Sequence, residues 1–262
     1  MMRITTLASG SSGNCALISS GDTHILVDAG ISMRRIKTGL AAMGLQPEHL
    51  SGVFITHEHS DHVSGLPMLI KHHGIKIFSP HTVASRLRGM LPDIDPFLEI
   101  IHIGEPVCLG DMRVTAFHTL HDTDESVGYR IDGEVSLGFC TDLGRVTDEV
   151  REALRGVCAA VIESNHDENM LRDGGYPIYL KRRILSERGH LSNESCGELA
   201  AFLAENGAET LVLSHLSREN NTPARALAGV GSALLRAGQS AELLIAPPLG
   251  NLTVEACAPC LL

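Results

Sequence analysis

The sequence predicts an α/β fold in which two β-sheets are covered by helices. Short apolar runs separated by turn residues dominate residues 99–140, whereas helical patterns alternate with single strands from residue 147 onward. Apolar residues make up 44% of the 262 residues and charged residues 20%, which is ordinary for a globular protein with a sizeable core. We therefore expect one sandwich domain that spans residues 1–262.

Strands and helices can be assigned in order along the first part of the chain. The expected strands cover residues 3–7, 15–19, 24–30, 52–56 and 76–79. The expected helices cover residues 32–43, 65–74 and 82–90. Ser32 is a suitable N-cap for the first helix, and Gly44 is a suitable stop.

The second part begins with four more strands, which GD, HD and DG turn signals separate. These strands are expected at residues 99–103, 112–117, 126–131 and 135–140. Helices are then expected at 147–154, 177–187, 192–206 and 222–237, with strands at 157–164, 209–214, 241–246 and 251–255. Thr222 and Pro223 form a favourable N-cap and first-turn pair for the last helix.

Charge and cysteine content limit the classes of function. The net charge of −10 does not favour extensive binding to nucleic acid, although it leaves room for a local basic patch around a metal. The seven cysteines lack framework spacing, which indicates reduced thiols in a cytoplasmic protein. Cys257 and Cys260 form a single CxxC pair without two further ligands nearby, so we interpret CAPC as a tail. Because no signal-peptide pattern or long apolar run is present, we expect no membrane association.

The segment THEHSDH, residues 56–62, concentrates metal-binding chemistry after an apolar strand. His57, Glu58, His59, Asp61 and His62 lie within six positions. A turn can aim the first two histidines at one point, and the aspartate and last histidine at another. Such ligands suit Zn, Mn or Fe better than Ca or Mg. A histidine-rich surface loop is the alternative, but four ligating side chains at this spacing are hard to obtain by chance.

Further candidate ligands stand at the ends of expected strands. They are Asp28, His118, His121, Asp142, His166, His190 and His215.

These residues fall within sequence motifs that resemble a known family. LVDAG, THEHSDH, HD, TDLG and SHLS occur in the order of the five motifs of the metallo-β-lactamase superfamily. The resemblance extends over essentially the whole chain and implies a four-layer αββα sandwich. ASGSSGNC, ESNHD and HLSRENN resemble more narrowly the YycJ/WalJ (VicX) subgroup of phosphodiesterases or 5′-to-3′ exonucleases. A looser similarity links the chain to PhnP-type phosphodiesterases.

The family pattern implies a site for two divalent metal ions, either Zn or Mn, with Fe as a further option. Its expected ligands are His57, His59 and His121 for one ion, Asp61, His62 and His215 for the other, and Asp142 as a bridge. His118 is a rival for the place of His121. Asp28 is expected to support the ligand loop by hydrogen bonds.

The resemblance also implies catalytic and phosphate-binding residues. His190 in GHLSN resembles a general acid or phosphate-oxygen donor, with a helix-cap role as its alternative, and Asp61 is the second catalytic candidate. The candidate phosphate-binding residues are Ser9, Ser11, Ser12, Asn14, His166, Lys181, Arg182 and Arg218. An ordinary turn around residues 9–14 and a solvated helix face at 181–183 are the structural alternatives.

The implied function is hydrolysis of a nucleic-acid phosphodiester by a hydroxide that bridges two metal ions. One alternative is a phosphodiesterase for small or cyclic nucleotides, and a less favoured one is a thioester or lactone hydrolase. The complete ligand set argues against a non-catalytic binding module. The expected partner is a nucleic acid or nucleotide substrate, and a homodimer is the assembly that we consider.

Overall fold

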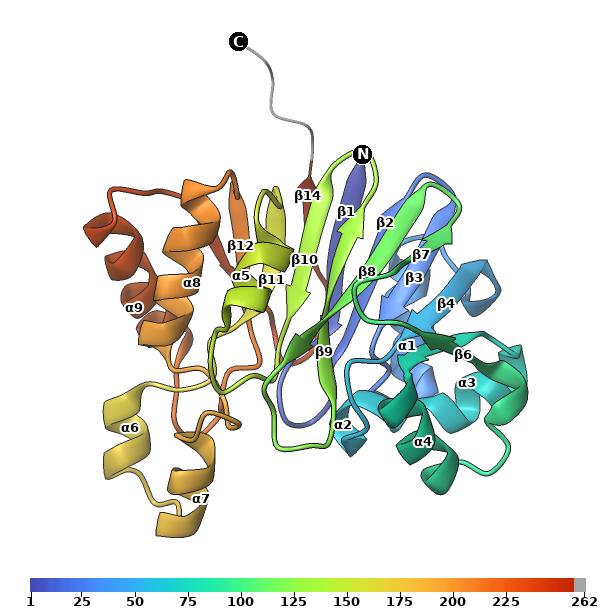
Figure 1. The fold of residues 1–262 in the computed structure, drawn as a ribbon, viewed down its shortest axis with the longest axis horizontal. Coiled ribbons are helices and arrows are strands. Elements are labelled where there is room, and N and C mark those ends of the chain that lie inside the picture. The colour runs from blue at the N-terminus through green and yellow to red at the C-terminus, as the bar shows by residue number, and fades with distance from the viewer. Residues whose placement is uncertain (257–262) are drawn as a thin grey trace.

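The computed structural model describes residues 1–256 and places the first β-sheet along one side of a sandwich (Figure 1). Its strand order is β14-β1-β2-β3-β4-β5-β6. The strands are β1 (Met2–Ala8), β2 (Cys15–Ser20), β3 (Thr23–Val27), β4 (Leu50–Phe54), β5 (Ile77–Pro80), β6 (Leu98–Ile101) and β14 (Leu252–Ala256). Antiparallel pairing joins β14, β1, β2 and β3, whereas β3 to β6 are parallel. The carboxyl ends of β3 and β4 therefore meet at one edge.

The second sheet also combines an antiparallel part with a parallel part. Its strand order is β13-β12-β11-β10-β9-β8-β7. The strands are β7 (Pro106–Leu109), β8 (Met112–Thr119), β9 (Ser126–Asp132), β10 (Ser136–Cys140), β11 (Ala159–Glu163), β12 (Thr210–Ser214) and β13 (Glu242–Ile245). Strands β7 to β10 pair antiparallel, and β10 to β13 pair parallel. The carboxyl ends of β10, β11 and β12 consequently lie side by side.

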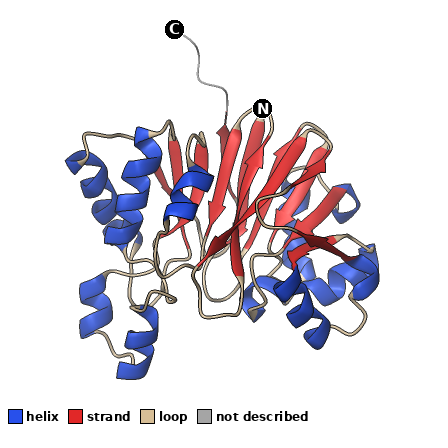
Figure 2. Ribbon diagram, viewed as in Figure 1, coloured by secondary structure: helices blue, strands red, loops and turns tan. Residues whose placement is uncertain are grey.

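Helices cover the outer face of each sheet (Figure 2). Those on the first sheet are α1 (Met33–Ala42), α3 (Leu66–His73) and α4 (His81–Met90). Those on the second sheet are α5 (Asp148–Leu154), α8 (Asn193–Glu205) and α9 (Pro223–Arg236). Between the sheets, Ile18, Phe54, Tyr129 and Val161 belong to one buried apolar cluster. The predicted four-layer αββα sandwich is therefore confirmed.

Three short helices lie near the ends of the strands. They are α2 (Ser60–Val63), α6 (Glu168–Asp173) and α7 (Ile178–Ile184), and single 3₁₀ turns occur at Pro47–His49 and Asp95–Phe97. Figure 1 shows α6 and α7 below α8 and α9, outside the four layers. Within residues 1–256, no helix has the length and apolar character needed to cross a membrane.

Local sequence signals place the longer helices well. The hydroxyl of Thr222 accepts a hydrogen bond from the backbone N–H of Arg225, and Ser192 caps α8 in the same way through Ser195. The sequence patterns missed β7, α2 and α6, because elements of four to six residues are too short to show a clear period. The CAPC motif lies outside the described residues.

Gly30 sets how closely β3 can approach the histidine loop. A Cβ atom at this position would lie 1.6 Å from the carbonyl oxygen of Asp61. We predict that Gly30→Ala lowers the free energy of unfolding by about 2–3 kcal/mol, because the crowded backbone must move. Urea unfolding measures this change. Gly89→Ala in α4 is the control, since no atom lies within 4 Å of its added Cβ. An unchanged stability of Gly30→Ala would contradict the close packing of Gly30 against Asp61.

Candidate metal centre

The candidate site forms where parallel strands of both sheets end. Asp28 follows β3, His57 lies shortly after β4, and Asp142 and His215 follow β10 and β12. The backbone is left-handed at Asp28, Asp142 and His215, with φ of 60°, 59° and 54°. No other non-glycine residue within 1–256 has a positive φ. Since this conformation is unfavourable for residues with a Cβ atom, the site and not local preference sets the backbone here.

The structure brings the predicted ligands from four separate segments into one cluster. Three groups each place their ligand atoms within 4.8 Å of one another: His57, His59 and His121; His57, His62 and Asp142; and Asp61, His62 and His215.

Asp142 lies between these groups. Its Oδ2 atom is 3.3 Å from Nε2 of His62, and its Oδ1 atom is 3.9 Å from Nε2 of His121 and 3.2 Å from Nδ1 of His215. A carboxylate with two oxygens can serve two neighbouring ions at once. The position of Asp142 therefore suits a bridging ligand.

Protein acceptors orient four of the histidine rings through their Nδ1 atoms. Their partners are the hydroxyl of Thr56 for His57, the carboxylate of Asp28 for His62, the carbonyl of Gly189 for His121 and the carboxylate of Glu163 for His215. Each contact is 2.7–3.0 Å long and leaves Nε2 for the centre of the cluster. His59 differs, because its Nδ1 atom lies 3.0 Å from Nε2 of His57 and thus faces the centre itself. Such outer contacts fix the ring orientation that metal ligands need.

The rival histidine, His118, lies on the outer surface of the second sheet. Its side chain is 53% exposed and its Nδ1 atom contacts Oε1 of Glu149 at 3.0 Å. Because side chains alternate along β8, His118 points away from the site. The structure therefore favours His121 as the ligand candidate.

Glu163, the first residue of the ESNHD motif, is a central residue to which the sequence analysis assigned no role. It ends β11, is fully buried, and its Oε1 atom lies 2.7 Å from Nδ1 of His190 and 2.9 Å from Nδ1 of His215. Its Oε2 atom accepts hydrogen bonds from the backbone N–H groups of Leu143 and Leu191, each at 3.1 Å. Burial raises the pKa of this carboxyl, but the rings of His190 and His215 outweigh it and hold the pKa below its ordinary value. A single carboxylate at the end of an apolar strand was the available signal.

The protein atoms of the site fit divalent cations. Among the described residues, no hydrogen bond reaches Oδ2 of Asp142 or Nε2 of His215, although both atoms are buried. Burial lowers the pKa of His62, whereas Asp28, Asp142 and Asp61 raise it, to about 9 overall. The imidazoles thus face an excess of buried negative charge, which bound cations would compensate. Nitrogen and carboxylate donors together suit transition-metal ions.

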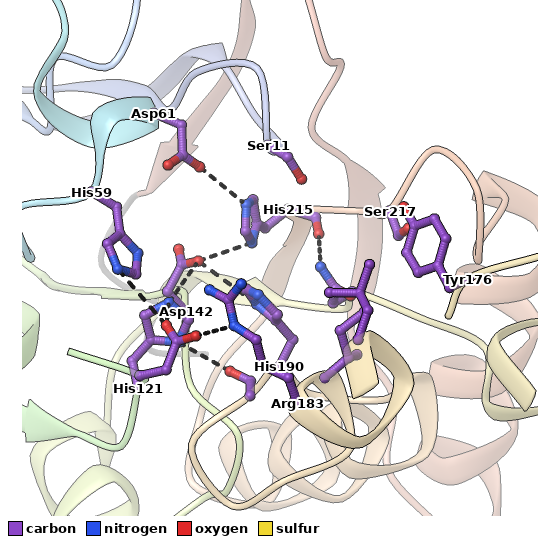
Figure 3. Close-up of a pocket in the computed structure, with 15 residues that line it drawn as sticks. Ser11, His59, Asp61, His121, Asp142, Tyr176, Arg183, His190, His215 and Ser217 are labelled. Atoms are coloured by element: carbon purple, nitrogen blue, oxygen red, sulfur yellow. Dashed lines mark hydrogen bonds and ion pairs between the residues drawn. The ribbon is translucent and has the colours of Figure 1, made fainter. Parts of the chain in front are cut away.

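An open cavity of about 260 Å³ leads to this cluster (Figure 3). His59, Asp61, His121, Asp142, His190 and His215 line its inner part. Ser11, Ser217 and Tyr176 also line it, and α7 contributes Leu180 and Arg183. His190 is 20% exposed, and its Nδ1 contact with Glu163 leaves Nε2 for a bound molecule.

The predicted phosphate-binding residues differ in their position relative to the cavity. Ser11 lines the cavity, and Arg218 donates a hydrogen bond to the hydroxyl of Ser12 on the exposed rim. Ser9 and Asn14 are buried and already used: Ser9 accepts the backbone N–H of His215, and Asn14 contacts His62 and accepts the N–H of Gly10. These two residues therefore support the ligand loops.

The remaining three phosphate-binding candidates are not among the described residues that line the cavity. His166 is only 1% exposed, and neither of its ring nitrogens has a hydrogen-bond partner within residues 1–256. Lys181 donates to the carbonyl of Arg172, and Arg182 is exposed on α7. The helical phase turns the next residue, Arg183, toward the cavity instead.

Arg183 forms an ion pair with Asp122 at the cavity wall. The other oxygen of Asp122 lies 3.1 Å from Nε2 of His121. Burial raises the pKa of Asp122, but the hydrogen bond from Arg183 and neighbouring positive charge keep it below the usual value. The guanidinium of Arg183 is thus held beside the candidate metal ligands, where an incoming anion can reach it.

Comparison with known proteins assigns the chain to a family. The model of the β-lactamase superfamily domain matches residues 23–216. The chain belongs to the β-lactamase superfamily. Within this superfamily, it is 34% identical to the exodeoxyribonuclease YycJ of Bacillus anthracis over 241 residues, which cover 90% of each chain. The predicted resemblance to the YycJ subgroup is therefore confirmed.

Solved structures of this superfamily agree with the fold. The metallo-β-lactamase fold protein YhfI of Bacillus subtilis has a TM-score of 0.74 at 19% identity, covering 97% of this chain and 100% of that chain. A diphosphatase of the PhnP family has a TM-score of 0.68 at 16% identity, with coverage of 98% and 100%. At these identities the similarity establishes the shared architecture alone.

We predict that Glu163→Gln weakens metal binding about 10- to 100-fold. Each oxygen of this carboxylate contacts two groups, which are backbone N–H donors or ring nitrogens. In Gln, an NH₂ donor replaces one of the oxygens, so two of the four groups would lose their acceptor. Competition titration with a fluorescent zinc chelator measures the affinity. Glu205→Gln, at an exposed position of α8, is the matched control. Equal affinities in both variants would contradict the orienting role of Glu163.

Proposed function

We propose that this protein is a binuclear metal-dependent phosphodiesterase that acts as an exonuclease on nucleic acid. One arrangement supports this most directly: His190, held by Glu163, faces the same cavity as Asp142 and Arg183. The name of the YycJ relative supports the choice of a nuclease over other hydrolases of the superfamily. The support for the substrate comes from the Arg183 guanidinium, which suits a phosphoryl oxygen better than a neutral thioester.

We propose two ions in this site, Zn or Mn, with Fe as an option. The proposed ligands are His57, His59 and His121 for the first ion, Asp61, His62 and His215 for the second, and Asp142 for both. When bound, the ions would supply a nucleophile from water at neutral pH and positive charge beside the phosphoryl oxygens.

The protein's own residues would then perform the remaining tasks. Arg183 leaves its ion pair with Asp122 and binds a non-bridging oxygen of the phosphodiester instead. His190 gives the proton on Nε2 to the leaving oxygen, because Glu163 holds its Nδ1 and fixes the ring. Asp61, at the cavity wall, completes the ligand loop and accepts a hydrogen bond from attacking water. Positioning and charge stabilisation carry most of the rate in such reactions.

The second candidate is a phosphodiesterase for small or cyclic nucleotides. The cavity of about 260 Å³ supports it, because it lies below the roughly 300–1,000 Å³ typical of ligand pockets. The acidic net charge of −10 also favours a small substrate over a long polyanion. A thioester or lactone hydrolase has no comparable support, since neither substrate needs Arg183.

We also propose a cytoplasmic location. Within residues 1–256 the five cysteines are unpaired, as expected in a reducing compartment.

We predict that the protein hydrolyses bis-p-nitrophenyl phosphate with added Mn²⁺, and that His59→Ala abolishes this activity. The variant removes one of three nitrogens that face the first proposed ion. Release of p-nitrophenolate measures turnover, and His118→Ala is the control because that ring points away from the site. Wild-type activity in His59→Ala would defeat the assignment.

A substrate panel separates the two candidate functions. It contains 5′-phosphorylated single- and double-stranded DNA, RNA, cyclic nucleotides and a thioester. An exonuclease gives its highest kcat/KM on a strand with a free end, whereas preference for cyclic nucleotides would establish the second candidate.

We predict that His190→Ala retains its metal but loses about 10²–10³-fold in kcat, as expected for removal of a general acid. Metal analysis of the purified variant, together with single-turnover kinetics, checks both parts. Full activity would exclude the proton-donor role, and loss of metal would place His190 among the ligands.

A further inference from the structure

The hairpin of α6 and α7, residues 168–184, projects beyond the strand ends of the second sheet (Figure 1). One face of α7 closes the cavity through Leu180, Arg183 and Ile184. The spacing of these residues places them on a single side of the helix. The flanks of α7 remain open to solvent, and the proposed function assigns them no role.

One flank of α7 carries an exposed aromatic ring. The chain has six Phe and three Tyr and no Trp, and all nine aromatic residues lie within residues 1–256. Tyr179 is 75% exposed, whereas the other eight are buried or partly buried. Its neighbour Ile178 is also exposed. Among residues 1–256, Tyr179 is therefore the one strongly exposed ring, and it lies on the helix that lines the cavity through Leu180, Arg183 and Ile184.

Positive charge surrounds this ring in an otherwise acidic protein. Helix α7 contains Lys181, Arg182 and Arg183 and no acidic residue, although the net charge of the chain is −10. Arg183 is paired with Asp122, and Lys181 donates to a backbone carbonyl. By contrast, no hydrogen bond or ion pair joins the side chain of Arg182 to any other residue in the described part of the chain.

Helix geometry connects these groups in a path. Residues three and four positions apart are neighbours on a helix, so Tyr179 lies beside both Arg182 and Arg183. Because Arg183 faces the cavity, the order Arg183, Tyr179, Arg182 leads from the proposed scissile phosphate toward solvent. Its alternation of cation, ring and cation matches the phosphates and bases of a polynucleotide.

We propose that Tyr179 and Arg182 bind a single-stranded nucleic acid segment next to the nucleotide held in the cavity. This inference rests on the proposed phosphodiesterase function and specifies its substrate as an unpaired strand. The base stacks on the ring of Tyr179, and the adjoining phosphate contacts Arg182. In a duplex, neighbouring base pairs cover the base faces, so the ring selects unpaired nucleotides.

The test compares Tyr179→Ala with Tyr179→Phe, which keeps the ring. We measure binding of a 5′-phosphorylated twelve-residue oligothymidylate to the metal-loaded protein by fluorescence anisotropy, in the slow His190→Ala background. We also measure kcat/KM for the same strand and for bis-p-nitrophenyl phosphate in the native background. Tyr179→Ala is expected to weaken strand binding about tenfold, as loss of one stacked base predicts, while Tyr179→Phe stays within about twofold. Hydrolysis of bis-p-nitrophenyl phosphate, which is too short to reach the ring, changes less than about twofold in both variants.

Arg182→Ala provides a second measurement. Loss of one phosphate contact should reduce the slope of log Kd against log salt concentration by about 0.7. Arg236→Ala, on the remote helix α9, is the matched control and leaves the slope unchanged.

Three results would overturn the proposal. The first is equal strand binding by Tyr179→Ala and wild type, and the second is an equal loss with bis-p-nitrophenyl phosphate, which would indicate a structural role. The third is conversion of a dimer into a monomer by Tyr179→Ala, which would make this flank an interface between copies of the chain. The binding assay needs no turnover, so a protein that binds the strand through Tyr179 but hydrolyses no phosphodiester would disprove the proposed function alone.

Discussion

The site depends on one constraint: four carboxylates that are buried or mostly buried bring negative charge, which other groups must compensate. Asp28, Asp61, Asp142 and Glu163 all contact imidazole rings there, and only Asp61 has appreciable exposure. Unpaired charges at such depth are costly, so every carboxylate needs a cation or several donors. Glu163 and Asp28 are satisfied by protein donors, whereas Asp142 keeps a buried oxygen without a hydrogen bond from the described residues. That difference separates the supporting carboxylates from the proposed ligands.

The connection between α7 and α8 links the substrate side of the cavity to the ligands. Arg188 donates to the carbonyl of His121, and the carbonyl of Gly189 accepts from the ring of the same histidine. His190 and the N–H of Leu191 both contact Glu163. One short segment therefore fixes a proposed ligand, the proposed proton donor and the base of the helix that carries Arg183. This explains why the GHLSN motif is longer than one catalytic histidine would require.

The sequence revealed those parts of the site whose residues lie close together in the chain. The THEHSDH loop supplies four of the predicted ligands, and the order of the other motifs led to Asp142 and His215. Glu163 was part of the quoted ESNHD motif but received no role, because a lone glutamate at a strand end has no ligand spacing, although an acid in an apolar strand is itself a signal. Which of Lys181, Arg182 and Arg183 faces the cavity depends on the rotation of α7 about its axis. The sequence of so short a helix does not define this rotation, whereas the structure shows that Arg183 lines the cavity. Longer elements were predictable from period and caps, whereas β7 and α6 were too short.

Two adjacent cations held by residues from distant segments are the core of this account. Diffraction from crystals grown with Mn²⁺, recorded near the manganese absorption edge, tests it most directly. The account predicts two anomalous peaks on either side of Asp142, one beside His57 and His121 and the other beside His62 and His215. An anomalous map with no peak among these side chains, or with their nitrogens turned away from any shared ion, would contradict it.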